Sequence, residues 1–275
     1  MYWRLLKSPQ TGLLIGTGLA GYMSARCPVF NVETVLGVVL SLFLAIAGST
    51  VLNMWWDRDI DSKMRRTQNR PIGSGEITAS EALWLGLTLA IAGVGLATLI
   101  GAWYGLVVFA GLFCDVVVYT LWLKRRTCWS IVWGGLAGGM PILAGRVLAV
   151  GGLDWIGGLL ALGILFWIPT HILTYTLRYA ADYQAAGIPT FASTYGIDAT
   201  RMGIAVSSLL AALAMGISAW GIGLTVLHLY SLAVLSLILV GLAALSLIRP
   251  TPRANVGLFK YASIYVLLSM VLMVI

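Results

Sequence analysis

Three acidic residues stand within five positions of one another in a chain that has ten acidic residues in all. The segment N-M-W-W-D-R-D-I-D at 53–61 spaces Asn53, Asp57 and Asp61 four residues apart, so they share one face of a continuous helix. Proteins commonly hold Mg²⁺ with one or two carboxylates and substrate phosphates, and this set fits that pattern. We therefore predict that all three are catalytic residues and metal ligands. The alternative is a solvated helix end whose acids pair with the neighbouring cations, Arg58, Lys63 and Arg65.

Basic residues follow the acids directly, in R-R-T-Q-N-R-P at 65–71, and a second basic group, L-K-R-R, ends a later apolar segment. The planar guanidinium group of arginine presents a fork of donors that suits phosphate oxygens. Acids for a metal beside cations for an anion predict a diphosphate site with Mg²⁺ as its cofactor. The alternative is that these cations only anchor the cytoplasmic membrane interface. The candidate diphosphate-binding residues are Arg66, Arg70, Tyr119, Lys124 and Arg125.

Three further polar residues are candidates for the same site. Asp182, in A-D-Y-Q-A-A-G-I-P at 181–189, is a candidate catalytic residue and metal ligand, although a plain ion pair with a neighbouring arginine is an equal alternative. His171 is a candidate proton acceptor or polar contact beside the reacting carbon, the alternative being a buried, hydrogen-bonded histidine. Asp115 lies inside an apolar segment, where acids are costly and commonly functional. The sequence leaves open whether the Asp115 side chain is protonated or is paired with a residue on another helix.

The composition defines the elements that must position these residues. The chain has 275 residues, of which 60% are apolar and 10% charged, and its mean hydropathy is +0.94. Soluble domains carry about 25% charged residues, so we predict an all-α membrane protein that forms a single domain over residues 1–275. A membrane-crossing helix needs about 20 mainly apolar residues. The nine segments that meet this condition are 11–30, 34–54, 83–101, 105–123, 129–149, 155–177, 203–221, 225–247 and 256–275.

The distribution of basic residues predicts the orientation. If the N-terminus is cytoplasmic, only Arg26 and Arg146 of the 17 basic residues lie away from the cytoplasmic tail and loops. We therefore expect a multi-pass plasma-membrane protein with cytoplasmic active-site loops and an external C-terminus. The net charge of +7 comes without a polar segment that mixes basic and aromatic residues, so nucleic acid is not an expected partner. Three dispersed cysteines and two histidines argue against a disulfide framework or a zinc site.

These motifs resemble those of the intramembrane prenyltransferase (UbiA) superfamily. The segment 53–72 resembles its first aspartate-rich motif, and L-K-R-R-T at 123–127, P-T-H at 169–171 and D-Y-Q-A-A-G-I-P look most like the branch that farnesylates protoheme IX. The resemblance implies nine transmembrane helices around a central cavity, and Mg²⁺ that binds and helps to ionise an isoprenyl diphosphate. By the resemblance, Mg²⁺ and diphosphate would be bound by Asn53, Asp57 and Asp61, and the diphosphate oxygens by Arg66, Arg70, Lys124 and Arg125.

The resemblance implies transfer of a farnesyl group from farnesyl diphosphate to heme B, giving heme O, in a membrane enzyme whose substrates are themselves membrane-soluble. The superfamily often has a second motif with two acids four residues apart. In this chain Arg178 stands at the first of these positions, so Asp182 is the one acid of that motif. One alternative is another membrane-soluble acceptor, either an aromatic quinone precursor or a glycerol-phosphate lipid. A different class of function is a transporter or non-catalytic assembly protein, but transporters usually hold their polar sites near mid-membrane, whereas these acids cluster at one face.

Overall fold

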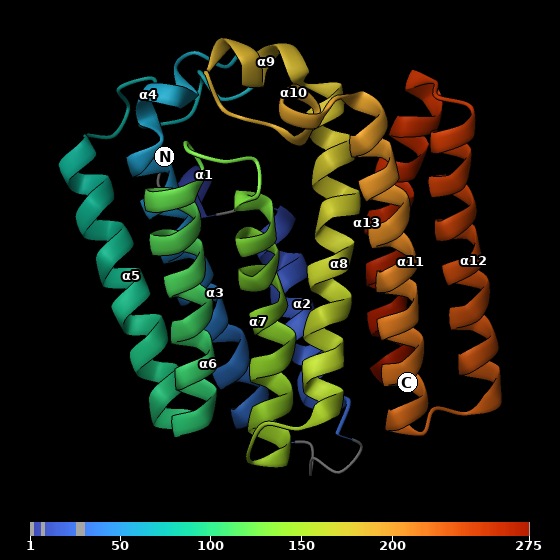
Figure 1. Ribbon diagram of the computed structural model, residues 1–275. Helices are drawn as coiled ribbons and strands as arrows, with labels where there is room; N and C mark the ends of the chain where they lie inside the picture. The colour runs from blue at the N-terminus through green and yellow to red at the C-terminus, as the bar shows by residue number, and fades with distance from the viewer. Residues whose placement is uncertain (1–2, 7–8, 26–30, 275) are drawn as a thin grey trace.

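The computed structural model describes residues 3–6, 9–25 and 31–274, and within them it contains helices and no strand (Figure 1). The helices run up and down in one bundle, with short helical segments in the loops at one end. The helices are α1 (Trp3–Leu6), α2 (Pro9–Met23), α3 (Val32–Trp56), α4 (Arg58–Asp61), α5 (Ala79–Ile100), α6 (Ala102–Phe113), the π-helix η1 (Cys114–Leu123), α7 (Ser130–Val150), α8 (Trp155–Arg178), α9 (Ala180–Ala185), α10 (Phe191–Tyr195), α11 (Ile197–Ile222), α12 (Val226–Ile248) and α13 (Pro252–Val274).

Eight of the described helical segments are long and apolar enough to cross a membrane, with α6 and η1 together forming one of them, Ala102–Leu123. They correspond to the second to ninth predicted spans, so the expected all-α membrane fold is confirmed. The first predicted span, 11–30, differs because α2 has 15 residues and ends at Met23. The last part of that prediction, residues 26–30, lies outside the described residues. The expected count of nine is therefore reached only when the shorter α2 is included.

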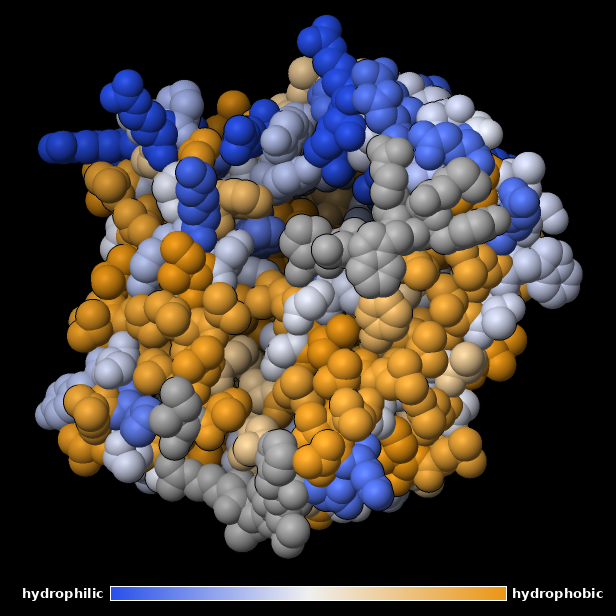
Figure 2. Space-filling view, turned by 180° about the vertical axis from the view of Figure 1, so that it is seen from behind, coloured by the Kyte–Doolittle hydropathy of each residue, from blue (hydrophilic) through white to orange (hydrophobic). Residues whose placement is uncertain are grey.

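The outer surface of the bundle has the polarity of a membrane protein. Figure 2 shows apolar side chains across the middle of one face, with hydrophilic side chains gathered at the end that carries the loops. Large apolar residues such as Trp84, Leu99 and Leu237 are 67–86% exposed. Because water would penalise so much exposed apolar surface, the lipid chains are its natural solvent.

Close backbone contact joins α2 to α7. A Cβ atom placed on Gly21 would lie 2.0 Å from the carbonyl oxygen of Ile142, and one on Gly145 would lie 1.9 Å from that of Gly18. No side chain fits at either position, so glycine is what lets the two helices approach. This contact holds the short α2 against the bundle.

The end of α2 that lies away from Asp57 and Asp61 is fixed by a buried arginine. The Arg146 guanidinium on α7 donates to the carbonyl oxygen of Ser24 at 2.8 Å and forms an ion pair with Asp154 at 2.7 Å. Asp154 in turn caps α8 through the Gly157 amide at 2.8 Å. Arg146 is thus a structural link between α2, α7 and α8 at the end of the bundle opposite Asp57 and Asp61.

Candidate functional site

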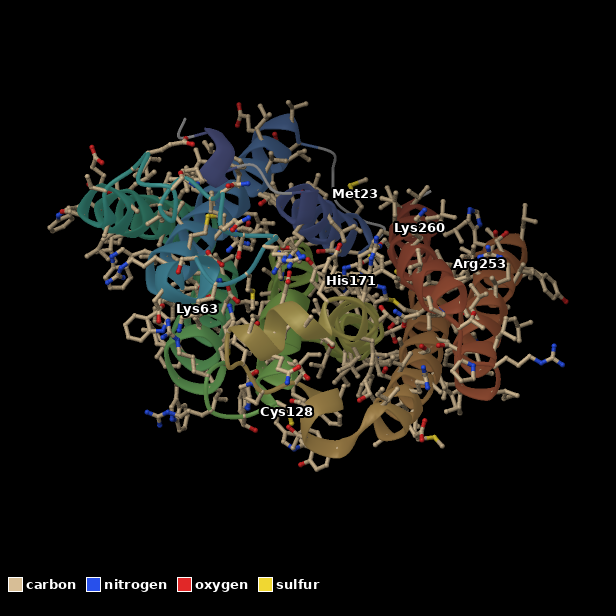
Figure 3. All side chains as sticks on the ribbon, turned by 90° about the horizontal axis from the view of Figure 1, so that it is seen from above. Met23, Lys63, Cys128, His171, Arg253 and Lys260 are labelled. Atoms are coloured by element: carbon tan, nitrogen blue, oxygen red, sulfur yellow. The ribbon has the colours of Figure 1, made fainter. Side chains whose placement is uncertain are left out.

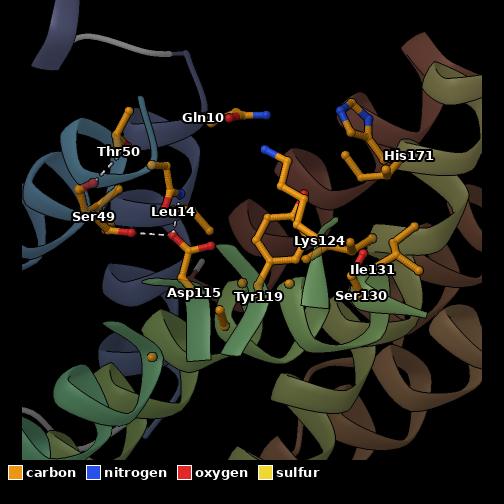
Figure 4. Close-up of a pocket in the computed structure, with 18 of the residues that line it drawn as sticks. Gln10, Leu14, Ser49, Thr50, Asp115, Tyr119, Lys124, Ser130, Ile131 and His171 are labelled. Atoms are coloured by element: carbon orange, nitrogen blue, oxygen red, sulfur yellow. Dashed lines mark hydrogen bonds between the residues drawn. The ribbon is translucent and has the colours of Figure 1, made fainter. Parts of the chain in front are cut away.

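A cavity of about 430 Å³ opens among α2, α3, η1, α7 and α8 (Figure 4). One end of it is polar, at the loop-bearing end of the bundle, and the remainder is mainly apolar. Seen along the helices, His171 lies near the middle of the bundle (Figure 3). The polar end is lined by Asp57, Arg70, Tyr119 and Lys124, and the apolar walls include Leu13, Leu42, Ile46, Val108, Met140 and Trp167. A cavity of this kind suits an amphipathic ligand with an anionic head and an apolar tail.

Asp57 is the acid most directly placed in the cavity. It lies directly after the last residue of α3, close to the predicted end of that span, and its backbone (φ −86°, ψ 6°) separates α3 from the short α4. Its Oδ2 atom contacts the Lys124 ammonium, while its buried Oδ1 atom has no hydrogen-bond partner among the described residues. Burial raises the pKa of this carboxyl above its ordinary value, although Lys124 acts in the opposite direction.

The i to i+4 spacing nevertheless keeps the three predicted ligands connected. The amide of Asp57 bonds to the carbonyl of Asn53 at 2.9 Å, and the amide of Asp61 bonds to that of Asp57 at 2.8 Å. Asp61 is buried and forms an ion pair with Arg70 at 2.7 Å. The acids therefore pair with Lys124 and Arg70, which come from more distant positions than the cations considered in the solvated-helix alternative.

Arg125 is engaged on the outer side of the same motif. Its guanidinium donates to both carboxylate oxygens of Asp59, at 2.8 and 2.7 Å, and to the Trp56 carbonyl at 2.9 Å. These hydrogen bonds from Arg125 hold the pKa of Asp59 below its ordinary value. Arg125 is 3.8 Å from Asp57, but it is not among the residues that line the cavity.

The other predicted residues fall in three places. His171 lines the cavity, stacked between the rings of Trp167 and Phe259 at centroid distances of 5.1 and 4.5 Å. Arg66 lies over the Tyr175 ring at 5.2 Å, and Asp182 is half-buried on α9; neither belongs to the described cavity lining. The loop of Asp182 does reach the cavity, through its neighbour Tyr183 and through residues 188–191.

Asn53 and Asp115 lie beside each other in the cavity wall. The Asn53 amide nitrogen donates to Asp115 at 3.1 Å, and the Ser49 hydroxyl donates to the same carboxylate oxygen. This answers the question that the sequence left open, because Asp115 has its partners on another helix, α3. Ser49 and Thr120 were not identified from the sequence, because their contacts depend on the π-helical register of η1 and on which faces of α3 and η1 meet.

The oxygen donors around Asp57 suit Mg²⁺ only together with oxygens from a bound substrate. No group of three or more histidine, cysteine, aspartate or glutamate side chains is arranged to hold a metal within the described part of the chain. The buried Oδ1 atom of Asp57, however, has no hydrogen-bond partner among the described residues and lies 3.8 Å from the Arg125 guanidinium. This carboxylate oxygen can therefore accept a cation, with the Asn53 side chain one turn away. The residues therefore fit a cation that shares its coordination with the phosphates of a bound substrate, the usual arrangement for Mg²⁺.

Comparison with known proteins identifies the family. The model of the UbiA prenyltransferase family matches residues 14–267, and the chain belongs to this family. It is thus a membrane-embedded prenyltransferase, as the sequence motifs indicated. A protoheme IX farnesyltransferase from Archaeoglobus fulgidus is 45% identical over 193 residues, which are 70% of this chain and 67% of the relative. One from Korarchaeum cryptofilum is 39% identical over 206 residues, covering 75% and 69%.

Solved structures share the fold at lower identity. A structure of digeranylgeranylglyceryl phosphate synthase aligns with a TM-score of 0.82 over 99% of this chain and 97% of its own, at 20% identity. A UbiA homologue from Archaeoglobus fulgidus, bound to GPP and Mg²⁺, aligns with a TM-score of 0.71 over 99% of both chains, at 15% identity. These similarities establish the UbiA fold for the present chain.

Proposed function

We propose that this protein transfers the farnesyl group of farnesyl diphosphate to heme B, in a Mg²⁺-dependent reaction that yields heme O. Relatives that are 38–45% identical carry the name protoheme IX farnesyltransferase, which supports heme B as the acceptor. The observation that carries the diphosphate part of the proposal is the buried Oδ1 atom of Asp57, which has no hydrogen-bond partner among the described residues and lies beside two cavity-lining cations. An anionic head and a divalent cation together satisfy these groups.

The binding roles follow from the cavity lining and, for Asp61, which is not part of that lining, from its ion pair with the cavity-lining Arg70. Lys124 and Arg70 already lie beside Asp57 and Asp61, so a diphosphate bound here meets ammonium and guanidinium donors together with the two acids. Asn53, Asp57 and Asp61 are the proposed metal ligands, with Tyr119 as a further contact at the polar end. Arg66, Arg125 and Asp182 lie around this group rather than in the described cavity lining, so direct contact between them and the diphosphate requires a change in side-chain position.

The chemistry requires that charge be stabilised as the prenyl group leaves. A bound Mg²⁺ would neutralise the charge that develops on the diphosphate. The C1–O bond breaks with both electrons going to diphosphate, and Lys124 and Arg70 donate hydrogen bonds to its oxygens as that charge develops. A vinyl carbon of heme B then bonds to C1, and water adds to the neighbouring carbon with release of a proton.

The cavity walls protect the allylic cation formed in this step. Leu42, Ile46 and Val108 keep bulk water away from the prenyl chain, and the faces of Tyr119 and Trp167 attract positive charge. His171, held between two aromatic rings, is the polar group of the opposite wall and the proposed contact with the acceptor.

Product mass tests this function directly. Purified protein in lipid nanodiscs would be incubated with farnesyl diphosphate, heme B and Mg²⁺, and the extracted pigments analysed by mass spectrometry. We expect hydroxyethylfarnesyl heme and inorganic diphosphate, both abolished by EDTA and restored by added Mg²⁺. Transfer to an aromatic quinone precursor or to a glycerol-phosphate lipid, with no heme product, would overturn the acceptor assignment.

We further propose that the whole chain acts as one domain in the plasma membrane, with the N-terminus and the loops 57–78 and 179–196 in the cytoplasm and the C-terminus outside. The strong bias of basic residues toward one end of the bundle supports this orientation. Farnesyl diphosphate is water-soluble at its head and is thus expected to reach the site from the cytoplasmic side.

A further inference from the structure

Asp115 is an intramembrane acid that the proposed reaction does not use. It lies in η1, its side chain lines the cavity, and one of its oxygens accepts hydrogen bonds from both Ser49 and Asn53 (Figure 4). Both partners belong to α3, one turn apart. A carboxylate held in this way at membrane depth is costly unless it serves the site.

The oxygen of the Asn53 amide is bound by a second residue of η1. The Thr120 hydroxyl, which is fully buried, donates to Asn53 Oδ1 at 2.7 Å. The side-chain amide of Asn53 is therefore hydrogen-bonded through its nitrogen to Asp115 and through its oxygen to Thr120. Because Asp115 Oδ2 accepts from the amide nitrogen and the Thr120 hydroxyl donates to the amide oxygen, this pair fixes which end of the amide faces which partner.

The π-helical geometry of η1 allows Asp115 and Thr120 to bind the same side chain. Asp115 and Thr120 are five residues apart, and at 3.6 residues per turn an α-helix would point them about 140° away from each other. A π-helix bonds each residue to the one five positions on, so it stacks them on one face. The same spacing joins Tyr119 and Lys124, where the Lys124 amide bonds to the Tyr119 carbonyl at 2.8 Å and its ammonium lies 5.6 Å from the Tyr119 ring.

We infer that Asp115 and Thr120 are positioning residues, which hold the Asn53 side chain so that the second lone pair of its oxygen faces the magnesium diphosphate headgroup. This inference rests on the proposed function, since it takes Asn53 as a ligand of that headgroup. Partners of this kind behind a metal ligand typically change metal affinity 10- to 100-fold when removed. The η1 segment thus acts on the metal through α3, without a ligand of its own.

A double-mutant cycle tests the inference through binding. Mn²⁺ affinity in the presence of inorganic pyrophosphate would be measured by electron paramagnetic resonance for wild type, Thr120→Val, Asp115→Leu, Asn53→Ala and the two double variants. We expect each η1 variant to weaken Mn²⁺ binding about tenfold in the wild-type background. In the Asn53→Ala background the same changes should alter it less than about twofold, because their target is gone.

Controls separate positioning from folding. Thr98→Val removes an exposed hydroxyl that bonds only within α5, to the Val94 carbonyl, and should leave Mn²⁺ affinity unchanged. The thermal unfolding midpoint in detergent reports whether any variant is misfolded. If the isosteric Thr120→Val variant unfolds at the same temperature as wild type, its loss of Mn²⁺ affinity is due to the missing hydroxyl. Fully additive losses, or no Mn²⁺–pyrophosphate binding by the wild type, would overturn the inference. If the losses in Mn²⁺ affinity are non-additive but the protein makes no heme O, only the proposed function is rejected and the positioning role stands.

Discussion

At the residue scale, the site is built from pairs in which each charged group has a defined partner. Asp57 contacts Lys124, Asp61 contacts Arg70, and Asp59 contacts Arg125. Only the first two of these pairs bring a cation into the cavity lining. The three acids of the motif therefore differ in what they face, although they are close in sequence.

Asp57 is the acid whose loss should matter most. Asp57→Asn removes the carboxylate charge that a divalent cation needs, so we expect Mg²⁺-dependent diphosphate release to fall at least about a hundredfold. Release of inorganic diphosphate from farnesyl diphosphate is the measurement. Asp198→Asn is the matched control, since that carboxylate is fully exposed and forms only a 3.6 Å ion pair with Arg201. Undiminished turnover by Asp57→Asn would remove Asp57 from the site.

A charge reversal distinguishes two roles for Arg125. If it supports the motif through Asp59, Arg125→Asp should reduce diphosphate release and Asp59→Arg in the same chain should restore much of it, because the ion pair is re-formed in reverse. If Arg125 binds the diphosphate directly, the double variant stays as inactive as Arg125→Asp. The bidentate contact with Asp59 leads us to expect restoration. The Asp59→Arg single variant completes the comparison.

At the element scale, backbone contact between α2 and α7 determines where the first wall of the cavity lies. Gly21→Ala should lower the thermal unfolding midpoint by several degrees, because overpacking of this size costs about 1–3 kcal/mol. Gly16→Ala on the same helix is the control, since a Cβ there meets no described atom within 4 Å. Tryptophan fluorescence during heating measures both. Equal midpoints for the two variants would contradict the described contact.

Much of the element layout could be predicted from the sequence. Apolar length is a strong signal, so the helices from α3 to α13 that cross the membrane were located to within a few residues. The π-helix was not predicted, because residues 105–123 have the same hydropathy whatever their helical register. The exact position of the break at Asp57 was not predicted, since a four-residue spacing of polar groups suits both one helix and two successive turns.

The residues of the candidate site could be predicted from the sequence better than the contacts between them. Asp57, Arg70, Tyr119, Lys124 and His171 were named from the sequence and do line the cavity. The partners of each charge could not be predicted, because they depend on how η1 and α3 face each other. Hence Arg125, which the motif assigns to diphosphate, is bonded to Asp59.

At the scale of the whole molecule, the two marked chain ends lie toward opposite ends of the bundle (Figure 1). This matches an odd number of membrane crossings, with the short α2 as one of them. Its 15 residues span about 22 Å, less than the roughly 30 Å of a typical hydrocarbon core. The orientation of the protein therefore depends on a helix that length alone does not identify as transmembrane.

Cysteine accessibility checks this topology. In a variant with its native cysteines replaced, Gly152→Cys in the α7–α8 loop should react with a membrane-impermeant maleimide added outside intact cells. Ser74→Cys, in the loop after α4, should react only after the cells are made permeable. Labelling in the reverse order would show that the acids face outward and would contradict the cytoplasmic assignment.

The π-helix has a consequence for how related sequences are compared. Each turn of η1 holds more residues than an α turn, so a single-residue insertion or deletion within 114–123 rotates everything on one side of it relative to the other. Such a gap would exchange the side chains that face the cavity, although the length of the span would hardly change. Among homologues, a one-residue gap inside this span is therefore a marker of altered ligand contacts.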